Sequence, residues 1–233
     1  MQNLHEGAGL YQSVIESPIA WETAGQSVQG RDIYVKTFGQ GERTVMIIGG
    51  FHGDEIRGVE LALRFAEYLH ENQVQLDDVR VVAIPVLSPD GLVNQQRLNA
   101  NDVDINRNFP TENWTAESSR GPRYSPGTAP ASEPETRLMM ALLDQYKPQR
   151  IISIHAPLEV VNYDGPAKAL AEKMAAYTGY PVSGDIGYPT PGSFGNYAGV
   201  ENQIPTITLE LPAGPFEPMW VPNRNALLSA MKF

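Results

Sequence analysis

The feature that most constrains the fold of this chain is an alternation of short apolar runs with amphipathic segments. Apolar runs of the length of a buried β-strand occupy residues 44–48, 79–87, 150–155 and 205–212. Apolar residues recur at helical spacing in residues 54–72, 132–146, 166–180 and 223–231. This order predicts a single-domain layered α/β/α fold over residues 1–233, with a mixed, largely parallel central sheet flanked by helices.

Two local patterns refine this prediction. Residues 19–38 alternate like a β-hairpin with Gly30 near its tip, which makes the sheet a mixed one. Ser132 and Glu135 have the spacing of a capping box, which predicts the start of a helix.

Composition excludes several classes of function. The net charge of −10 argues against nucleic acid as a partner, since phosphate binding needs a basic surface. The chain has no cysteine, which excludes disulfides, thiolate-bound zinc and thiol catalysis. No apolar segment approaches the roughly 18 residues of a membrane span. The first residues lack the basic start and apolar core of an export signal, so we expect a cytoplasmic protein.

Polar residues stand where the predicted strands end. His52 and Glu55 follow the run 44–48, His155 closes the run 150–155, and Glu210 lies near the end of the last run. Ligands of open α/β sheets bind outside the carboxyl ends of the strands, so these four side chains could share one crevice. Two imidazoles and one carboxylate form a catalytic zinc set, and a nearby Glu210 would serve as general base. Taken singly, His155 could be a structural histidine and Glu210 a solvent-facing glutamate.

The long irregular region 87–132 predicts either a functional or a disordered loop. It carries Arg97 and Arg107, whose guanidinium groups suit a substrate carboxylate and a developing oxyanion. The alternative is a solvated loop in which these arginines pair with neighbouring aspartates. The chain has no phosphate-binding loop and no G-x-S-x-G motif, which disfavours serine hydrolysis.

The HGDE stretch, the later histidine in SIH, DINRNF and ITLELP together resemble the zinc metallocarboxypeptidases of the carboxypeptidase A type, in the same order and from about Gln29 onward. The resemblance implies one Zn²⁺ per chain, with metal ligands His52, Glu55 and His155. It implies that Glu210 is the general acid/base and that Arg97 polarises the scissile carbonyl. For substrate binding it implies Asn106 and Arg107, which would hold a terminal carboxylate, and Tyr188, which would be a mobile tyrosine.

The short length and the stretches SIHAP and NYDGPA are similar to a small bacterial branch of this family, the murein peptide amidases. That branch implies hydrolysis of the γ-D-glutamyl–meso-diaminopimelate bond of murein tripeptide in cell-wall recycling. Diaminopimelate ends in an ammonium and a carboxylate, and Asp185 is a candidate to bind the ammonium.

Two other functions remain open. A deacylase of N-acyl amino acids, of the desuccinylase or aspartoacylase type, shares His-x-x-Glu and an Asn-Arg pair, although NRNFP and the LP after Glu210 favour the peptidase. A more remote alternative is a non-catalytic binding module that retains the fold. For partners we expect a small peptide substrate, with neither nucleic acid nor a membrane, and a homodimer is left open.

Overall fold

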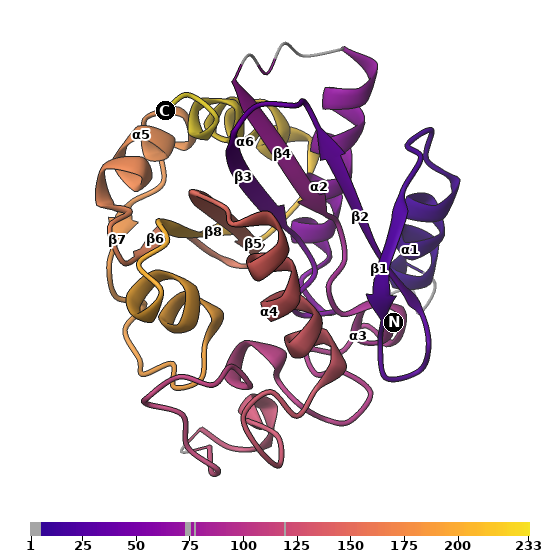
Figure 1. Ribbon diagram of the computed structural model, residues 1–233, viewed down its shortest axis with the longest axis vertical. Coiled ribbons are helices and arrows are strands. Elements are labelled where there is room, and N and C mark those ends of the chain that lie inside the picture. Colours follow the sequence, from indigo (N-terminus) through magenta and orange to yellow (C-terminus); the bar gives the residue numbers. More distant parts are fainter. Residues whose placement is uncertain (1–5, 73–75, 77, 119) are drawn as a thin grey trace.

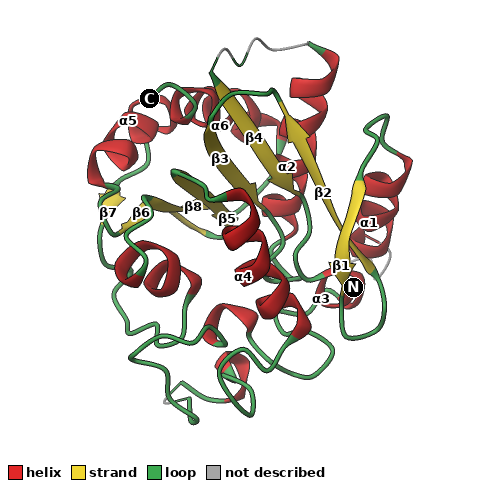
Figure 2. Ribbon diagram, viewed as in Figure 1, coloured by secondary structure: helices red, strands yellow, loops and turns green. Residues whose placement is uncertain are grey.

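The computed structural model describes residues 6–72, 76, 78–118 and 120–233, and within them the chain forms one central sheet between helices (Figures 1 and 2). The strands are β1 (Glu22–Gln26), β2 (Asp32–Phe38), β3 (Arg43–Ile48), β4 (Val79–Ile84), β5 (Arg150–His155), β6 (Leu158–Asp164), β7 (Val182–Ser183) and β8 (Thr206–Pro212). The α-helices are α1 (Glu6–Glu16), α2 (Ile56–Glu71), α3 (Pro89–Asn94), α4 (Pro134–Tyr146), α5 (Lys168–Thr178) and α6 (Glu217–Ala230).

The sheet is mixed, with a parallel centre. Its strand order is β1-β2-β4-β3-β5-β8-β6-β7. Strand β3 runs parallel to β4 and β5, and β5 runs parallel to β8. The pairs β1–β2, β2–β4 and β6–β8 are antiparallel. The predicted layered α/β fold and its leading hairpin are therefore confirmed.

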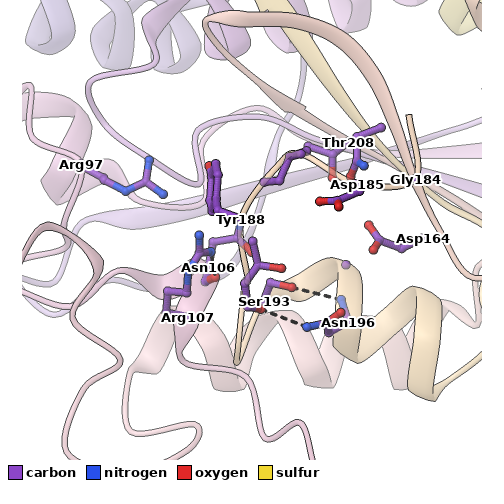
Figure 3. Close-up of a pocket in the computed structure, with 14 residues that line it drawn as sticks. Arg97, Asn106, Arg107, Asp164, Gly184, Asp185, Tyr188, Ser193, Asn196 and Thr208 are labelled. Carbon is purple, nitrogen blue, oxygen red and sulfur yellow. Dashed lines mark hydrogen bonds between the residues drawn. The ribbon is translucent and has the colours of Figure 1, made fainter. Parts of the chain in front are cut away.

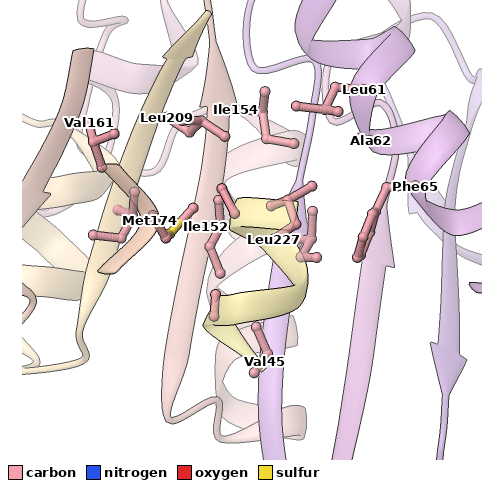
Figure 4. Close-up of a cluster of buried hydrophobic side chains, with 14 of the residues drawn as sticks. Val45, Leu61, Ala62, Phe65, Ile152, Ile154, Val161, Met174, Leu209 and Leu227 are labelled. Carbon is pink, nitrogen blue, oxygen red and sulfur yellow. The ribbon is translucent and has the colours of Figure 1, made fainter. Parts of the chain in front are cut away.

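Strand side chains alternate between two cores because successive residues of a strand face opposite sides of a sheet. Val45 and Ile47 of β3 pack with α2, α5 and α6 in the core of Figure 4. Met46 and Ile48 face the other side, where α4 lies. All four side chains are almost completely buried, so both faces of the sheet centre are covered.

Some expected boundaries are wrong. The strand expected at 79–87 ends at Ile84, and α6 begins at Glu217 rather than near Asn223, because Met219 and Trp220 are buried in the core. The predicted capping box does not form. Instead α4 begins at Pro134 and has no side-chain cap at its N-terminus, Ser132 Oγ donates to the neighbouring Glu133, and Glu135 is buried.

The topology determines where the candidate site lies. Strands β3, β5 and β8 are parallel neighbours, so their carboxyl ends meet at one edge of the sheet. The irregular segment after β4, magenta to pink in Figure 1, carries Arg97 and Arg107 and folds beside that edge. Across the described part of the chain, the helices are too short or too polar for any of them to cross a bilayer.

Candidate active site

Three of the four strand-end residues form a compact group. His52 and Glu55 lie in the loop between β3 and α2, and His155 is the last residue of β5. Glu55 bridges the two imidazoles, with Oε1 2.8 Å from Nδ1 of His52 and Oε2 2.8 Å from Nδ1 of His155. One ligand atom from each residue lies within 4.8 Å of the others, so this group could hold a metal ion.

Glycines let the loop after β3 fold tightly enough to present His52. Gly50 has a φ of +63°, a conformation that glycine adopts without penalty. A Cβ added to Gly53 would lie 1.8 Å from the carbonyl carbon of Gly91, so only glycine fits against that backbone. Glu55 occupies the N-cap position of α2 without capping it, because its carboxylate faces the two histidines.

Both imidazoles are also held from the opposite side. His52 Nε2 donates to Asp104 Oδ1 at 3.0 Å, and His155 Nε2 lies 2.8 Å from Ser153 Oγ. When the outer nitrogen of His52 carries the proton, a neutral ring directs the Nδ1 lone pair at the Glu55 carboxylate. With a lone pair on Nδ1 of each imidazole and a carboxylate between them, the group needs a cation, so the donor set fits a divalent metal. Hydrogen-bond partners on the other ring nitrogen, here Asp104 and Ser153, orient metal-binding histidines.

Asp104 was not among the predicted site residues, although it lies in the quoted DINRNF motif. Its carboxylate is fully buried and also accepts from Asn106 N and from Arg97 Nε, at 2.9 and 3.0 Å. Its pKa lies well below the usual range because the charges of His52 and Arg97 outweigh the opposing effect of burial. The sequence carries a signal for a buried Asp104, since the residue stands between the apolar Val103 and Ile105. Its contact with His52 could not be predicted from the sequence.

The electrostatics of the group favour an ionised Glu55. Burial alone would raise the pKa of Glu55, but His52 and His155 lower it well below its ordinary value. For His52, burial lowers the pKa, yet the carboxylates of Glu55 and Asp104 leave it raised overall. In the absence of metal, the negative charge of Glu55 therefore favours a proton on His52.

Glu210 lies beside His155. Strands β5 and β8 pair these two residues directly in register, so their side chains leave adjacent strands on the same face. Glu210 is 8% exposed and therefore does not simply face solvent. Its Oε2 accepts a long hydrogen bond of 3.4 Å from Leu158 N, and burial followed by the nearby charge of Glu55 raises its pKa. A raised pKa suits a carboxylate that has to carry a proton.

Arg97 adjoins the same group. Its guanidinium contacts Asp104 at 2.9 Å and Glu55 at 3.2 Å. It lines two hollows, and Glu55 of the metal-binding group lines the second of them. Arg97 can therefore reach an oxygen of a substrate bound in either hollow.

The first of these hollows is a pocket of about 150 Å³ that brings together five of the predicted residues (Figure 3). They are Arg97, Asn106, Arg107, Asp185 and Tyr188. Asn106 Oδ1 accepts from Phe194 N at 2.8 Å, so its amide nitrogen is the group left for a ligand. An engineered apolar cavity of about this size takes up benzene, so the pocket fits a single side chain.

Arg107 is the strongest anion-binding feature of the pocket. It is 5% exposed, and it makes no ion pair within the described ranges, although Asp104 lies near enough to act on its charge. Burial, followed by the nearby charge of Arg97, lowers its pKa. Buried charges are normally paired, so this guanidinium is poised for a carboxylate.

Tyr188 lies between the two hollows and borders both of them. The Arg120 guanidinium sits 3.7 Å from the centre of the Tyr188 ring and 4.4 Å from that of Tyr124, so the cation is stacked between two aromatic rings. Tyr188 thus lines the same pocket as Arg107, and its role in substrate binding and its movement stay predictions.

Comparisons with known proteins agree with this geometry. A zinc carboxypeptidase family profile matches residues 15–229. Murein peptide amidase A of Vibrio campbellii is 33% identical over 203 residues, which cover 81% of this chain and 77% of the relative. The protein of the same name from Escherichia coli K12 is 34% identical over 181 residues, 72% of this chain and 70% of its own.

Solved structures show the same architecture. The murein-tripeptide amidase MpaA from Escherichia coli O157 superposes with a TM-score of 0.79 and 26% identity, over 95% of both chains. Carboxypeptidase A from Helicoverpa armigera shares the fold, with a TM-score of 0.78 and 18% identity over 97% of this chain and 70% of its own. Family, fold and donor set agree, and the chain is a hydrolase that belongs to the zinc carboxypeptidase family.

Proposed function

We propose that this protein is a zinc-dependent amidase that removes the C-terminal residue of a small peptide, most specifically the diaminopimelate of murein tripeptide. The observation that carries the C-terminal preference is Arg107, a buried guanidinium without an ion pair in the described structure that borders a pocket beside the metal-binding group. The murein substrate is supported by the names of the relatives that match most of this chain.

We assign the metal to His52, Glu55 and His155, one zinc per chain. When bound, zinc would act as a Lewis acid and make a water acidic enough to ionise near neutral pH. Two imidazoles and one carboxylate suit zinc among divalent metals. Asp104 and Ser153 would fix the orientation of the two rings.

The remaining residues would bind substrate and move the proton. Arg107 and the Asn106 amide would hold the terminal carboxylate, and Arg97 would donate to the carbonyl oxygen as negative charge develops on it. Glu210 would take a proton from the attacking water and return it to the leaving nitrogen, which yields a carboxylate and an amine. Tyr188 would close over the bound residue. The cytoplasm stays our proposal for the compartment, supported by the likeness to the bacterial amidases.

The proposal is tested with purified protein, assayed for zinc, and L-Ala-γ-D-Glu-meso-diaminopimelate. Mass spectrometry should detect L-Ala-D-Glu and free diaminopimelate, and a chelator should abolish this turnover until zinc is restored. N-acetyl and N-succinyl amino acids serve as comparison substrates. Turnover of these N-acyl amino acids without cleavage of the tripeptide would replace the proposed function with a deacylase.

A further inference from the structure

The second hollow beside the metal-binding group is larger than the pocket that contains Arg107, and the proposed mechanism leaves it without an occupant. Its volume is about 600 Å³, compared with about 150 Å³ for the pocket. Glu55, Arg97 and Tyr188 border the hollow, so it adjoins the metal-binding group and the arginine proposed to face the carbonyl. With the C-terminal residue in the pocket, the hollow is the space available to the residues before the scissile bond.

Murein tripeptide carries an unusual group in this part of the molecule. The scissile bond joins diaminopimelate to the side-chain carboxyl group of D-glutamate, so the α-carboxylate of that glutamate stays free. Two methylene groups separate its α-carbon from the carbonyl carbon that is attacked. An α-linked peptide has no main-chain carboxylate before its scissile bond, so a suitably placed cation in the hollow would distinguish the two linkages.

Three arginines line the hollow, and two of them are held by several contacts inside the protein. Arg97 belongs to the group around the metal ligands. Arg57 lies 2.6 Å from Glu60 of its own helix, and its Nε donates to the carbonyl oxygen of Gly214 at 3.0 Å. The third arginine, Arg123, is the cation best placed to bind a ligand.

Arg123 presents its guanidinium at the wall of the hollow. Its side chain is 58% exposed, and its Nη2 donates to Oδ2 of Asp54 at 2.7 Å. No second acidic partner of Arg123 is present in the part of the chain that the structure describes. A guanidinium has five N–H groups, so Arg123 can bind the carboxylate of a ligand while it keeps its contact with Asp54.

Asp54 supplies an acceptor next to this cation. Its Oδ1 is buried and has no hydrogen-bond partner among the described residues, although its Oδ2 accepts from Arg123. A buried acceptor without a partner is unfavourable, which points to a donor supplied by a ligand. The α-carbon of the D-glutamate carries both a carboxylate and an amide N–H, and Arg123 together with Asp54 presents the complementary pair of groups.

We propose that Arg123 selects γ-linked peptides by binding the free α-carboxylate of the residue before the scissile bond, and that Asp54 Oδ1 accepts from the amide N–H on the same α-carbon. The inference rests on the proposed function, since it takes the pocket to hold the residue after the scissile bond and the hollow to hold the residues before it. Because water screens a charge as exposed as that of Arg123, the expected effect on binding is about 10-fold, at the low end for a charged hydrogen bond.

The test compares L-Ala-γ-D-Glu-meso-diaminopimelate with the same peptide containing D-isoglutamine, in which a carboxamide of the same size replaces the α-carboxylate. For the zinc-loaded parent enzyme, kcat/KM for the carboxylate peptide should be about 10-fold higher, through KM. Arg123→Gln should remove most of this ratio by raising KM for the carboxylate peptide, and leave kcat for the carboxamide peptide near the parent value. The matched control Arg57→Gln, in the same hollow, should keep the ratio.

Calorimetry with the zinc-loaded protein supplies a readout that needs no cleavage. The dipeptide L-Ala-D-Glu should bind more tightly than L-Ala-D-isoglutamine to the parent protein, and equally tightly to Arg123→Gln. Methylation of the amide nitrogen of L-Ala-D-Glu should weaken binding to the parent protein. The same methylation should have little effect in Asp54→Ala, whose zinc content is measured in the same sample.

The inference is overturned if Arg123→Gln keeps the ratio, or if Arg57→Gln is the variant that loses it. An equal effect of methylation in the parent protein and in Asp54→Ala refutes the role of Asp54. Cleavage of both peptides with equal kcat/KM by the parent enzyme refutes the inference and leaves the proposed function intact. If neither peptide is cleaved while L-Ala-D-Glu binds in an Arg123-dependent manner, the proposed function fails and the carboxylate site at Arg123 stands.

Discussion

Asp104 holds His52 by the ring nitrogen that faces away from Glu55. Its Oδ1 lies 3.0 Å from His52 Nε2, while its Oδ2 lies 2.9 Å from Arg97 Nη2. One buried carboxylate therefore fixes both the imidazole that would bind the metal and the guanidinium that would face the substrate. Loss of the Asp104 charge should therefore weaken metal binding more than it lowers the stability of the fold.

We expect Asp104→Asn to weaken zinc binding by about 10–100-fold, the usual effect of removing a group that orients a metal-binding histidine. Competition with a chromophoric chelator measures this affinity. Asp102→Asn is the matched control, since Asp102 lies in the same loop, is exposed, and has a φ of +57° that asparagine tolerates. An unchanged affinity in Asp104→Asn would show that Asp104 does not support the site.

The metal-free protein should have its own pH dependence. The folded pKa of His52 is raised from 6.5, because Glu55 and Asp104 outweigh burial, and that of Glu55 is lowered well below 4.5 by the two histidines. The His52 contribution to stability is fully present below pH 6.5 and is lost as pH rises through the raised pKa. The Glu55 contribution is present above pH 4.5 and is lost as pH falls through the lowered pKa.

Both contributions coexist between about pH 4.5 and 6.5, so Tm of the chelator-treated protein should decline above this window. Bound zinc replaces the proton at His52, so the loaded protein should not show this decline. Thermal melts with and without zinc from pH 5 to 9 measure the difference, and His70→Gln, at an exposed histidine, controls for other imidazoles. Parallel curves for the two forms would contradict the prediction.

The sequence predicted the parts of this site that depend on strand ends. Short apolar runs marked the central strands, and the rule that ligands gather at carboxyl ends placed His52, Glu55 and His155 together. The pairing of His155 with Glu210 in the structure adds the fourth residue. These positions could be predicted from the strand pattern and the sheet topology, because each residue lies at the end of a strand or in the short loop that follows it.

Residues that depend on the path of a loop, or on a strand outside the parallel centre of the sheet, were harder to predict. Strand β6 begins immediately after Pro157 and mixes polar with apolar residues, so the sequence pattern did not predict it. Asp164, the last residue of β6, was therefore not predicted as a site residue. Asp104 lay in a quoted motif, but its contact with His52 spans 52 positions through an irregular segment. Glu135 fitted a helix cap in sequence, yet it accepts hydrogen bonds from Val28 and Asn99 instead.

Glu210→Gln should retain zinc and lose turnover by about 10²–10⁴-fold, the usual contribution of a general base. Glutamine preserves the size of the side chain and can still accept from Leu158 N, but it cannot take a proton. Steady-state turnover of the tripeptide and zinc content of the same sample measure both effects. Glu159→Gln, at an exposed position nearby, should remain active. If Glu210→Gln turns over the tripeptide at close to the parent rate, another residue is the base.

Arg107→Ala should raise KM for peptides by about 10–100-fold, which corresponds to the loss of roughly 1.5–3 kcal/mol from a hydrogen bond to a charged group. The effect on kcat should be smaller, because the α-carboxylate lies away from the bond that breaks. Arg120→Ala is a control, since Arg120 stacks on Tyr188 but does not border this pocket. If KM is unchanged in Arg107→Ala, the terminal carboxylate binds at another group.

Asp164, the last residue of β6, lines the pocket, and Asp164→Asn should stabilise the ligand-free protein. A carboxylate that is largely removed from water destabilises the fold once it ionises. The pKa of Asp164 is raised from 3.8 to about 6 by burial. The penalty is absent below pH 3.8, grows as pH rises toward 6, and is constant above that. The difference between these values corresponds to a gain of up to about 3 kcal/mol at pH 7.5 and about half of that at pH 5. Urea unfolding at the two pH values measures it, with Asp185→Asn as the control.

A gain in stability in Asp164→Asn would identify Asp164 as a carboxylate without a partner in the folded protein, whose charge lowers the free energy of unfolding. A purely structural carboxylate would behave in the opposite way, since its removal would leave former partners unsatisfied and lower the free energy of unfolding. The sign of the stability change in Asp164→Asn therefore separates the two roles without any assay of activity. A destabilised variant at pH 7.5 would indicate that Asp164 has a partner in the folded protein.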